Sequence, residues 1–299
     1  MKAVVYACGS MGAVAVRRLL DAGFYIPLAI SEEEPGSSSV HELCGALNIP
    51  CMAPRDPNQF GWVERARKTR PDMLFCFNYP TLLKAQVLAV PKHGSFRLHR
   101  ALLPEHRGPD PVRRAIMAGQ RTTGVTLHEL VVEPYGGGVV ARQQVDIARD
   151  DTAASLEKRM EQAADAMLAT VLPRMKALDF SISPQDLTAG STHEVLTPED
   201  GGISWDRPAE EIHNLIRAFA RPFSGAFGLL GDEMVFFLRS AAVADCSMEP
   251  GVPGFREGTI LIGTGRGSLE PREIEVNGRV LTGPQLLAFF KEHGTDTFL

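Results

Sequence analysis

The order of apolar runs in the first eighty residues constrains the fold of this chain more than any other feature. Residues 2 to 7 alternate into an apolar strand, residues 13 to 20 have helical spacing, and residues 26 to 30 form a second strand. A further apolar run, Met73–Phe77, follows two helical stretches. Strands that alternate with helices pair in parallel, because right-handed crossovers return the chain to the same edge of the sheet. The sequence therefore predicts an α/β fold with a parallel sheet.

The turn after the first strand offers one competing function. It reads A-C-G-S-M-G, and Gly9 to Gly12 are predicted to form a tight turn before the helix. This resembles a dinucleotide fingerprint whose first glycine is replaced, and Glu32 to Glu34 lie where a ribose-binding acid would be. A nicotinamide-binding protein is therefore a competing class. Similar glycines also close parallel sheets that bind no nucleotide, so the turn alone is weak evidence.

The stretch from Gly94 to Gly108, G-S-F-R-L-H-R-A-L-L-P-E-H-R-G, is the candidate reaction centre. A strand over Ser95–Leu98 delivers His99 to a point where the chain must turn, since Pro104 and Gly108 enforce a loop. Ligands of such folds bind at the carboxyl ends of strands. The alternative is that His99 only closes the strand and that the basic residues form a solvated face. That face would comprise Arg97, Arg100, His106, Arg107, Arg113 and Arg114.

This stretch resembles the signature of the folate-dependent formyltransferases, N-x-H-x-S-L-L-P-x-x-R-G, which occurs in methionyl-tRNA formyltransferase and in the sugar-nucleotide amine formyltransferases. The matching positions are His99, Leu102, Leu103, Pro104, Arg107 and Gly108. Arg97 replaces the family's asparagine, Arg100 a small residue or proline, and Ala101 a serine. The segments 123–128 and 137–141 also resemble the family, and they place Tyr135 where the family has an aspartate. Two of the three catalytic positions thus differ.

The resemblance implies formyl transfer from 10-formyltetrahydrofolate to the amine of an anionic small molecule, such as an amino-sugar nucleotide. Because a tetrahedral oxyanion forms, the site needs a hydrogen-bond donor for it and a group that moves protons. His99 then stands at the centre, Arg97 takes the oxyanion role, and Tyr135 replaces the orienting acid and is expected to hydrogen-bond His99. The like charges of Arg97 and Arg100 should keep His99 mostly neutral at pH 7.

The resemblance also indicates where ligands would bind. The folate-binding positions are Thr81, Leu82, Leu83, Val131, Val132, Glu133, Pro134 and Tyr135. The substrate-binding positions are Met11, Arg100 and Arg107. Because the catalytic positions differ, two alternatives stay open. One is a catalytically silent homologue that binds a ligand or a partner, and the other is an acyl or one-carbon transferase, or a hydrolase, that uses a different donor.

The second half of the chain predicts a separate domain. Residues 179 to 202 are polar and rich in Ser, Thr, Pro and Gly, so we predict domains over 1–182 and 203–299 joined by a linker, 183–202. A helix over 208–220 is followed by short strands with close turns at Gly231-Asp232, Gly263–Gly267 and Asn277-Gly278. This pattern suggests a small OB-like β-barrel after a Rossmann-like formyltransferase domain, as the family has.

Charge and composition narrow the partners and the location. Residues 204–299 hold nine Lys or Arg against thirteen Asp or Glu, whereas nucleic-acid surfaces show clustered positive charge. We therefore expect a small-molecule amine substrate and no nucleic acid. No apolar run reaches the roughly 18 residues of a membrane span, and Met1–Tyr6 enters a strand directly, so a cytoplasmic protein is expected. Five cysteines without a C-x-x-C pair suggest no metal site, and the oligomeric state stays open, a homodimer included.

Overall fold

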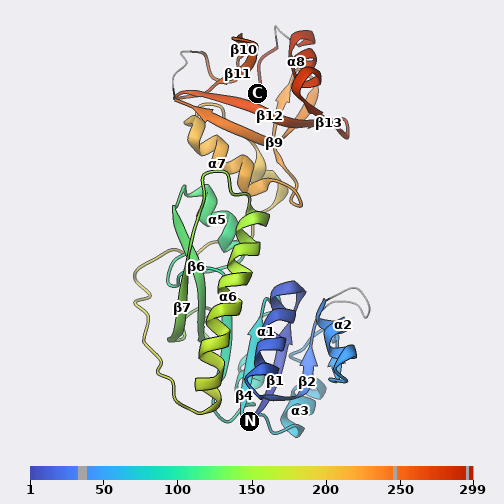
Figure 1. Ribbon diagram of the computed structural model, residues 1–299, viewed down its shortest axis with the longest axis vertical. Helices are drawn as coiled ribbons and strands as arrows, with labels where there is room; N and C mark the ends of the chain where they lie inside the picture. Colours follow the sequence, from blue (N-terminus) through green and yellow to red (C-terminus); the bar gives the residue numbers. More distant parts are fainter. Residues whose placement is uncertain (33–38, 245–247, 294–295, 299) are drawn as a thin grey trace. The chain divides into compact units, whose positions relative to one another are not determined.

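The computed structural model describes residues 1–32, 39–244, 248–293 and 296–298 (Figure 1). The chain forms two compact units. The first comprises residues 1–108, 123–145 and 158–193, and the second comprises residues 109–122, 146–157 and 194–299.

The first unit is built on a seven-stranded sheet in the order β3-β2-β1-β4-β5-β6-β7. Its strands are β1 (Lys2–Ala7), β2 (Tyr25–Ile30), β3 (Cys51–Met52), β4 (Met73–Phe77), β5 (Ser95–His99), β6 (Thr122–Glu129) and β7 (Val139–Asp146). Strands β1 to β5 pair in parallel, which confirms the prediction, and β6 runs antiparallel to β5. The strand order reverses between β1 and β4. At such a point the loops at the carboxyl ends of the strands diverge and leave room for a ligand.

Buried side chains pack against both faces of the parallel sheet. Strand β4 is buried along its whole length, which is typical of a parallel strand covered on both sides. On one face the rings of Tyr6 and Tyr79 meet edge-on, 5.4 Å apart. On the other, Phe75 contacts Phe77 and Phe96 with ring centres 5.7 and 5.8 Å apart. The helices α1 (Gly9–Asp21), α2 (Ser39–Ala46), α3 (Phe60–Lys68), α4 (Ala85–Leu88) and α6 (Ala153–Lys176) accompany these strands in the sequence.

Helix α1 begins earlier than predicted. A tight turn was predicted over Gly9 to Gly12, but the helix starts at Gly9, directly after Cys8. Gly9 has a φ of +65°, so it alone makes the turn. Gly12 lies inside the helix, where a Cβ would come within 3.1 Å of the Ala7 Cβ. The close approach of α1 to β1 therefore explains the second glycine.

The second unit is organised around an antiparallel sheet in the order β10-β11-β12-β9-β8, with β13 paired to β12. Its strands are β8 (Ala226–Leu230), β9 (Glu233–Val243), β10 (Pro253–Arg256), β11 (Thr259–Gly263), β12 (Ser268–Val276) and β13 (Arg279–Thr282). Its helices are α5 (Pro111–Met117), η1 (Pro198–Gly201), α7 (Ala209–Phe219) and α8 (Gly283–Glu292). Asn277 and Gly278 have φ of +50° and +75°, as a type I′ hairpin requires. The predicted small antiparallel β-domain is confirmed.

The predicted linker, 183–202, divides between the two units. Residues 183–193 group with the first unit, where the Arg107 N–H donates to the Ser191 carbonyl and the His193 N–H donates to the Arg107 carbonyl, both at 2.8 Å. Residues 194–202 group with the second unit, as do residues 109–122, because α5 packs against α7. The linker itself stays a prediction that proteolysis can test. Among the helices that the structure describes, none has the length and apolar character needed to cross a bilayer.

Candidate functional site

His99 is the last residue of β5 and is almost fully buried. Its Nε2 lies 2.9 Å from the carbonyl oxygen of His106. Because a carbonyl oxygen only accepts hydrogen bonds, Nε2 must carry the hydrogen and donate it. In the neutral ring this leaves Nδ1 as the nitrogen that can take up a proton. The loop that follows β5 therefore folds back and fixes the tautomer of the candidate catalytic histidine.

Arg97 and Tyr135 both lie close to this histidine, so the three predicted catalytic positions form one cluster in the first unit. Arg97 precedes His99 by two residues and shares its face of β5. The ring centres of His99 and Tyr135 are 4.8 Å apart in an edge-on contact. The guanidinium carbon of Arg97 lies 5.5 Å from the centre of the Tyr135 ring, a cation–π contact.

Tyr135 contacts His99 through its ring and not through the expected hydrogen bond. The hydrogen on Nε2 of His99 is already donated to the His106 carbonyl. Tyr135 itself has a φ of +61°, and the Gln185 side-chain amide donates to its carbonyl oxygen at 2.9 Å. Two residues further, a Cβ at Gly137 would lie 2.1 Å from the Glu129 carbonyl oxygen, so only glycine fits. The backbone thus holds the tyrosine ring in place.

Arg97 carries its charge without a carboxylate partner among the residues that the structure describes. Its Nε is buried and makes no hydrogen bond there. The residue as a whole is half-buried, so its charge is partly removed from water without a counter-charge among these residues, which costs free energy. A site that keeps such a cation is suited to an anionic ligand or to an oxygen that becomes negative during a reaction.

The environment keeps His99 neutral. Burial lowers the pKa of His99 well below its ordinary value, and the neighbouring His128, Arg97 and Arg100 lower it further. The hydrogen bond to the His106 carbonyl acts in the opposite direction but is outweighed. The prediction of a neutral ring at pH 7 therefore holds, although burial, and not the two arginines, is the largest cause.

A second histidine of this site, His128, was not predicted from the sequence. It lies in β6 directly opposite Arg97 in the strand register, and its ring centre is 6.4 Å from that of Tyr135. Burial and then the charge of Arg97 lower the pKa of His128 to about 4. The period of two in the predicted strand would have revealed this residue, once β6 had been paired with β5.

The predicted folate-binding positions separate into exposed and buried residues. Leu82, on one loop of the first unit, exposes 53% of its surface, and Val131 and Val132, on another, expose 39% and 70%. Leu83, in contrast, is buried in the core. Glu133 and Pro134 are exposed. The exposed residues could cover an apolar ring system, whereas Leu83 serves packing.

Polar contacts hold the first of these loops. The Thr81 hydroxyl donates to the Glu32 carboxylate. The Asn58 side chain donates to the Leu82 carbonyl at 3.0 Å and accepts from the Lys84 N–H at 2.7 Å. Two neighbouring segments thus fix the backbone of residues 81–84. A backbone must be fixed in this way if its N–H and carbonyl groups are to bind a ligand.

The predicted substrate-binding positions have different surroundings. Met11 is buried in α1, and Arg100 is half-buried. The Arg107 guanidinium donates to the carbonyl oxygens of Leu187 and Ala189, at 3.1 and 3.4 Å. These bonds connect the loop after His99 to the segment 187–193. Arg107 therefore has a structural role. A role of the three residues toward a substrate stays a prediction.

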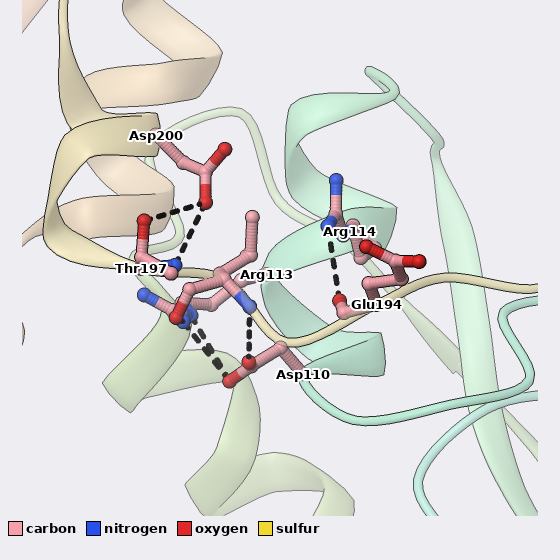
Figure 2. Close-up of polar contacts among 7 residues, drawn as sticks. Asp110, Arg113, Arg114, Glu194, Thr197 and Asp200 are labelled. Carbon is pink, nitrogen blue, oxygen red and sulfur yellow. Dashed lines mark hydrogen bonds and ion pairs between the residues drawn. The ribbon is translucent and has the colours of Figure 1, made fainter.

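The alternative of a solvated basic face does not hold for Arg113, a residue of the second unit that pairs with Asp110 (Figure 2). Its side chain is 8% exposed and lies 3.1 Å from the Asp110 carboxylate. Its guanidinium carbon lies 4.8 and 4.5 Å from the ring centres of Phe219 and Phe223. The neighbouring Arg114 donates to the Glu194 carbonyl at 3.1 Å. These contacts identify a packed and paired structural cation.

The dinucleotide alternative loses its main support, because Gly12 serves helix packing. Of the acidic run, Glu33 and Glu34 lie outside the described residues, and the Glu32 carboxylate is engaged by Thr81. Within the described ranges there is also no group of three or more His, Cys, Asp or Glu placed to hold a metal ion.

Comparisons with solved structures identify relatives of this fold. An N-formyltransferase from Helicobacter canadensis, in complex with folinic acid and dTDP-3-aminofucose, is 16% identical with a TM-score of 0.74, over 91% of this chain and 98% of that chain. WlaRD, a sugar 3N-formyl transferase with dTDP and 5-N-formyl-THF, is 16% identical with a TM-score of 0.71, over 92% and 97%. HypX from Aquifex aeolicus, in complex with tetrahydrofolic acid, is 18% identical with a TM-score of 0.62, over 96% and 47%. At these identities the similarity establishes the fold.

Family models cover both units. The formyl transferase model matches residues 17–172, and the model of the formyl transferase C-terminal domain matches residues 195–290. The first match includes the strand that ends at His99 and the loop of Tyr135. The chain therefore belongs to the formyl transferase family.

Proposed function

We propose that this chain transfers a formyl group from 10-formyltetrahydrofolate to the amine of an anionic small molecule, such as an amino-sugar nucleotide. The cluster of Arg97, His99 and Tyr135 at the end of β5 carries the proposal. Two relatives of the same fold were solved with formyl-folates and with dTDP or a dTDP-linked amino sugar, which supports this donor and this class of acceptor.

The residues of the cluster divide the chemistry between them. The folate supplies the formyl carbon. Arg97, whose charge has no carboxylate partner among the described residues, donates to the oxygen on which negative charge develops. His99, neutral and with Nδ1 unprotonated, accepts the proton that the acceptor nitrogen loses as its amine attacks the formyl carbon. The bond between that carbon and N10 of the folate then breaks, and N10 takes up a proton to leave as tetrahydrofolate. Tyr135 contacts both groups and positions them.

The donor would be held by the two loops whose apolar side chains are exposed. Leu82 on one loop and Val131 and Val132 on the other offer surface to a flat ring system. The hydrogen bonds of Asn58 fix the backbone that would present the first of these loops. Such backbone contacts tolerate substitutions better than side-chain contacts, which is consistent with the low identity to the relatives.

A steady-state assay with 10-formyltetrahydrofolate and dTDP-3-amino-3,6-dideoxygalactose tests the proposal, with the formylated sugar nucleotide as readout. Replacing His99 by Gln should lower the rate by about 10²-fold or more, the usual loss when a general base is removed. His93, a half-buried histidine outside the cluster, provides the matched control, and His93→Gln should leave the rate unchanged.

Two outcomes would favour the alternatives. Folate binding without turnover for any sugar nucleotide tested would indicate a catalytically silent homologue. Turnover without folate affinity would indicate a transferase or hydrolase that uses a different donor. Either result would leave the family assignment intact and refute the proposed activity.

A further inference from the structure

The second unit contains a cavity of about 700 Å³ that none of the predicted site residues lines. Three segments of this unit form its wall: the turn after α5, the segment after β7, and one face of α7. The polar residues that line the cavity are Gln120, Arg121, Arg149, Glu210, His213, Asn214 and Arg217. The volume falls within the range of small-molecule sites, so the cavity has room for a whole ligand.

Hydrogen bonds orient the side-chain amide of Asn214 at the wall of the cavity. Arg217 is buried, and its Nε and Nη2 both donate to the Asn214 side-chain oxygen, at 3.0 and 2.8 Å. Because arginine only donates, these bonds fix which end of the Asn214 amide is oxygen. The Asn214 Nδ2 therefore faces the other way, toward Gly119, where a Cβ would lie 3.1 Å from it. Two donor hydrogens are thereby held at the wall.

Two further arginines line the same cavity. Arg149 lies 3.2 Å from the Glu210 carboxylate, with side chains that are 72% and 60% exposed. A solvated pair of this kind contributes about 0–1 kcal/mol, so an anion can exchange for Glu210 at small cost. Arg121 is exposed and forms no side-chain hydrogen bond or ion pair with the residues that the structure describes.

The charge of the lining favours an anion. Two exposed arginines, Arg121 and Arg149, stand against one lining carboxylate, Glu210, because the buried Arg217 donates to the Asn214 side-chain oxygen and to the Asp151 carbonyl. Outside the lining, the Asp150 and Asp151 carboxylates act electrostatically on Arg217 and balance the charge of that buried arginine. The guanidinium fork matches the oxygens of a phosphate group better than other cations do.

We propose that this cavity binds a phosphate-bearing small molecule, with Arg121 and Arg149 on the phosphate oxygens and the Asn214 amide as a further donor. The site lies within the second unit and is separate from the cluster of His99. It therefore goes beyond the proposed formyl transfer, and it can be tested whether or not the chain transfers formyl groups.

Calorimetric titration of the full chain with inorganic pyrophosphate, inorganic phosphate, UDP and citrate tests the site. We expect saturable binding of pyrophosphate and UDP and weaker binding of citrate. The carboxylates of citrate also match the guanidinium group, but they lack the compact charge of a diphosphate. The double change Arg121→Ala with Arg149→Ala should raise the Kd about tenfold or more. Glu210→Gln should lower the Kd, because it frees Arg149 and removes the carboxylate of the lining.

Arg272→Ala is the matched control, because Arg272 belongs to the same unit and pairs with Glu270 on the surface at 3.3 Å. It should leave the Kd unchanged. All four altered side chains are largely exposed, so the variants should fold, and thermal unfolding checks this. Absence of saturable pyrophosphate binding, or equal weakening by Arg272→Ala, would refute the site. Tighter binding of transfer RNA than of UDP, with the same dependence on Arg121 and Arg149, would also refute a small-molecule ligand.

Discussion

Two arginines in the two compact units show what distinguishes a structural cation from a functional one. Arg113 in the second unit is paired with Asp110 and packed between two phenylalanine rings. Arg97 in the first unit has a buried Nε without a hydrogen bond and no carboxylate partner among the described residues. The protein compensates the first charge and leaves the second uncompensated. An uncompensated cation beside a buried neutral histidine indicates a place where a ligand supplies the missing charge.

The largest expected effect is a difference in stability between variants of these two arginines. Arg113→Leu should lower the free energy of unfolding by roughly 3–5 kcal/mol, because it leaves Asp110 without its partner and removes the contact with both rings. Arg97→Leu should change that free energy little or raise it, because it removes a cation that has no carboxylate partner in the described part of the chain and loses only the contact with the Tyr135 ring. Urea unfolding of both variants measures the difference. Equal losses would show that Arg97, too, is structural.

A pH titration of stability tests the buried histidines of the first unit. The pKa of His128 in the folded chain is about 4, below the value near 6.5 of an unfolded chain, so the unfolded chain binds the proton more readily. Stability is therefore full above pH 6.5 and falls as the pH drops toward 4, by about 3 kcal/mol for this residue. His99, whose pKa is also lowered, acts in the same direction.

The matched variant for this titration is His128→Gln. It should show a smaller loss of unfolding free energy between pH 6.5 and 4 than the natural chain, because the glutamine does not titrate. An identical pH dependence of the two proteins would mean that His128 is not buried in its neutral form.

Limited proteolysis tests the boundary between the units, and the expected effect is a change in the position of the first cut. Cleavage should occur first within 183–202, where most side chains are exposed. The bonds of Arg107 to Leu187 and Ala189 should slow it in the first half of that stretch. Arg107→Ala should therefore move the first cut toward residues 187–193. Preferred cleavage inside residues 1–182 would contradict the predicted linker.

The fold could be predicted from local patterns, because each of the apolar runs that end at Ala7, Ile30 and Phe77 predicts a strand by itself. The turn at Asn277-Gly278 was equally predictable, since few residues adopt the positive φ that both of its positions require. The membership of α5 in the second unit could not be predicted, because it depends on packing against α7, more than ninety residues later in the chain.

The site was predictable where a motif or an alignment named the residue. His99 and Arg97 came from the signature and Tyr135 from the alignment of two neighbouring segments, and the structure brings the three together. His128 was missed because it depends on pairing β6 antiparallel to β5, which no local pattern signals. The low pKa of His99 was attributed to two arginines, whereas the structure shows that burial dominates. Burial is a property of the folded site, so the sequence could not rank it.

The most direct test of the central claim restores the family's residues in the cluster. If Arg97, His99 and Tyr135 act on one formyl carbon, Arg97→Asn combined with Tyr135→Asp should raise the rate of formyl transfer from 10-formyltetrahydrofolate to dTDP-3-amino-3,6-dideoxygalactose. We expect about a tenfold gain for the double variant and less than about twofold for either single change, since the groups act on the same intermediate. The asparagine restores a compact amide donor, and the aspartate orients His99. Loss of the natural activity without a gain in formyl transfer would contradict the account and show that the cluster serves another reaction.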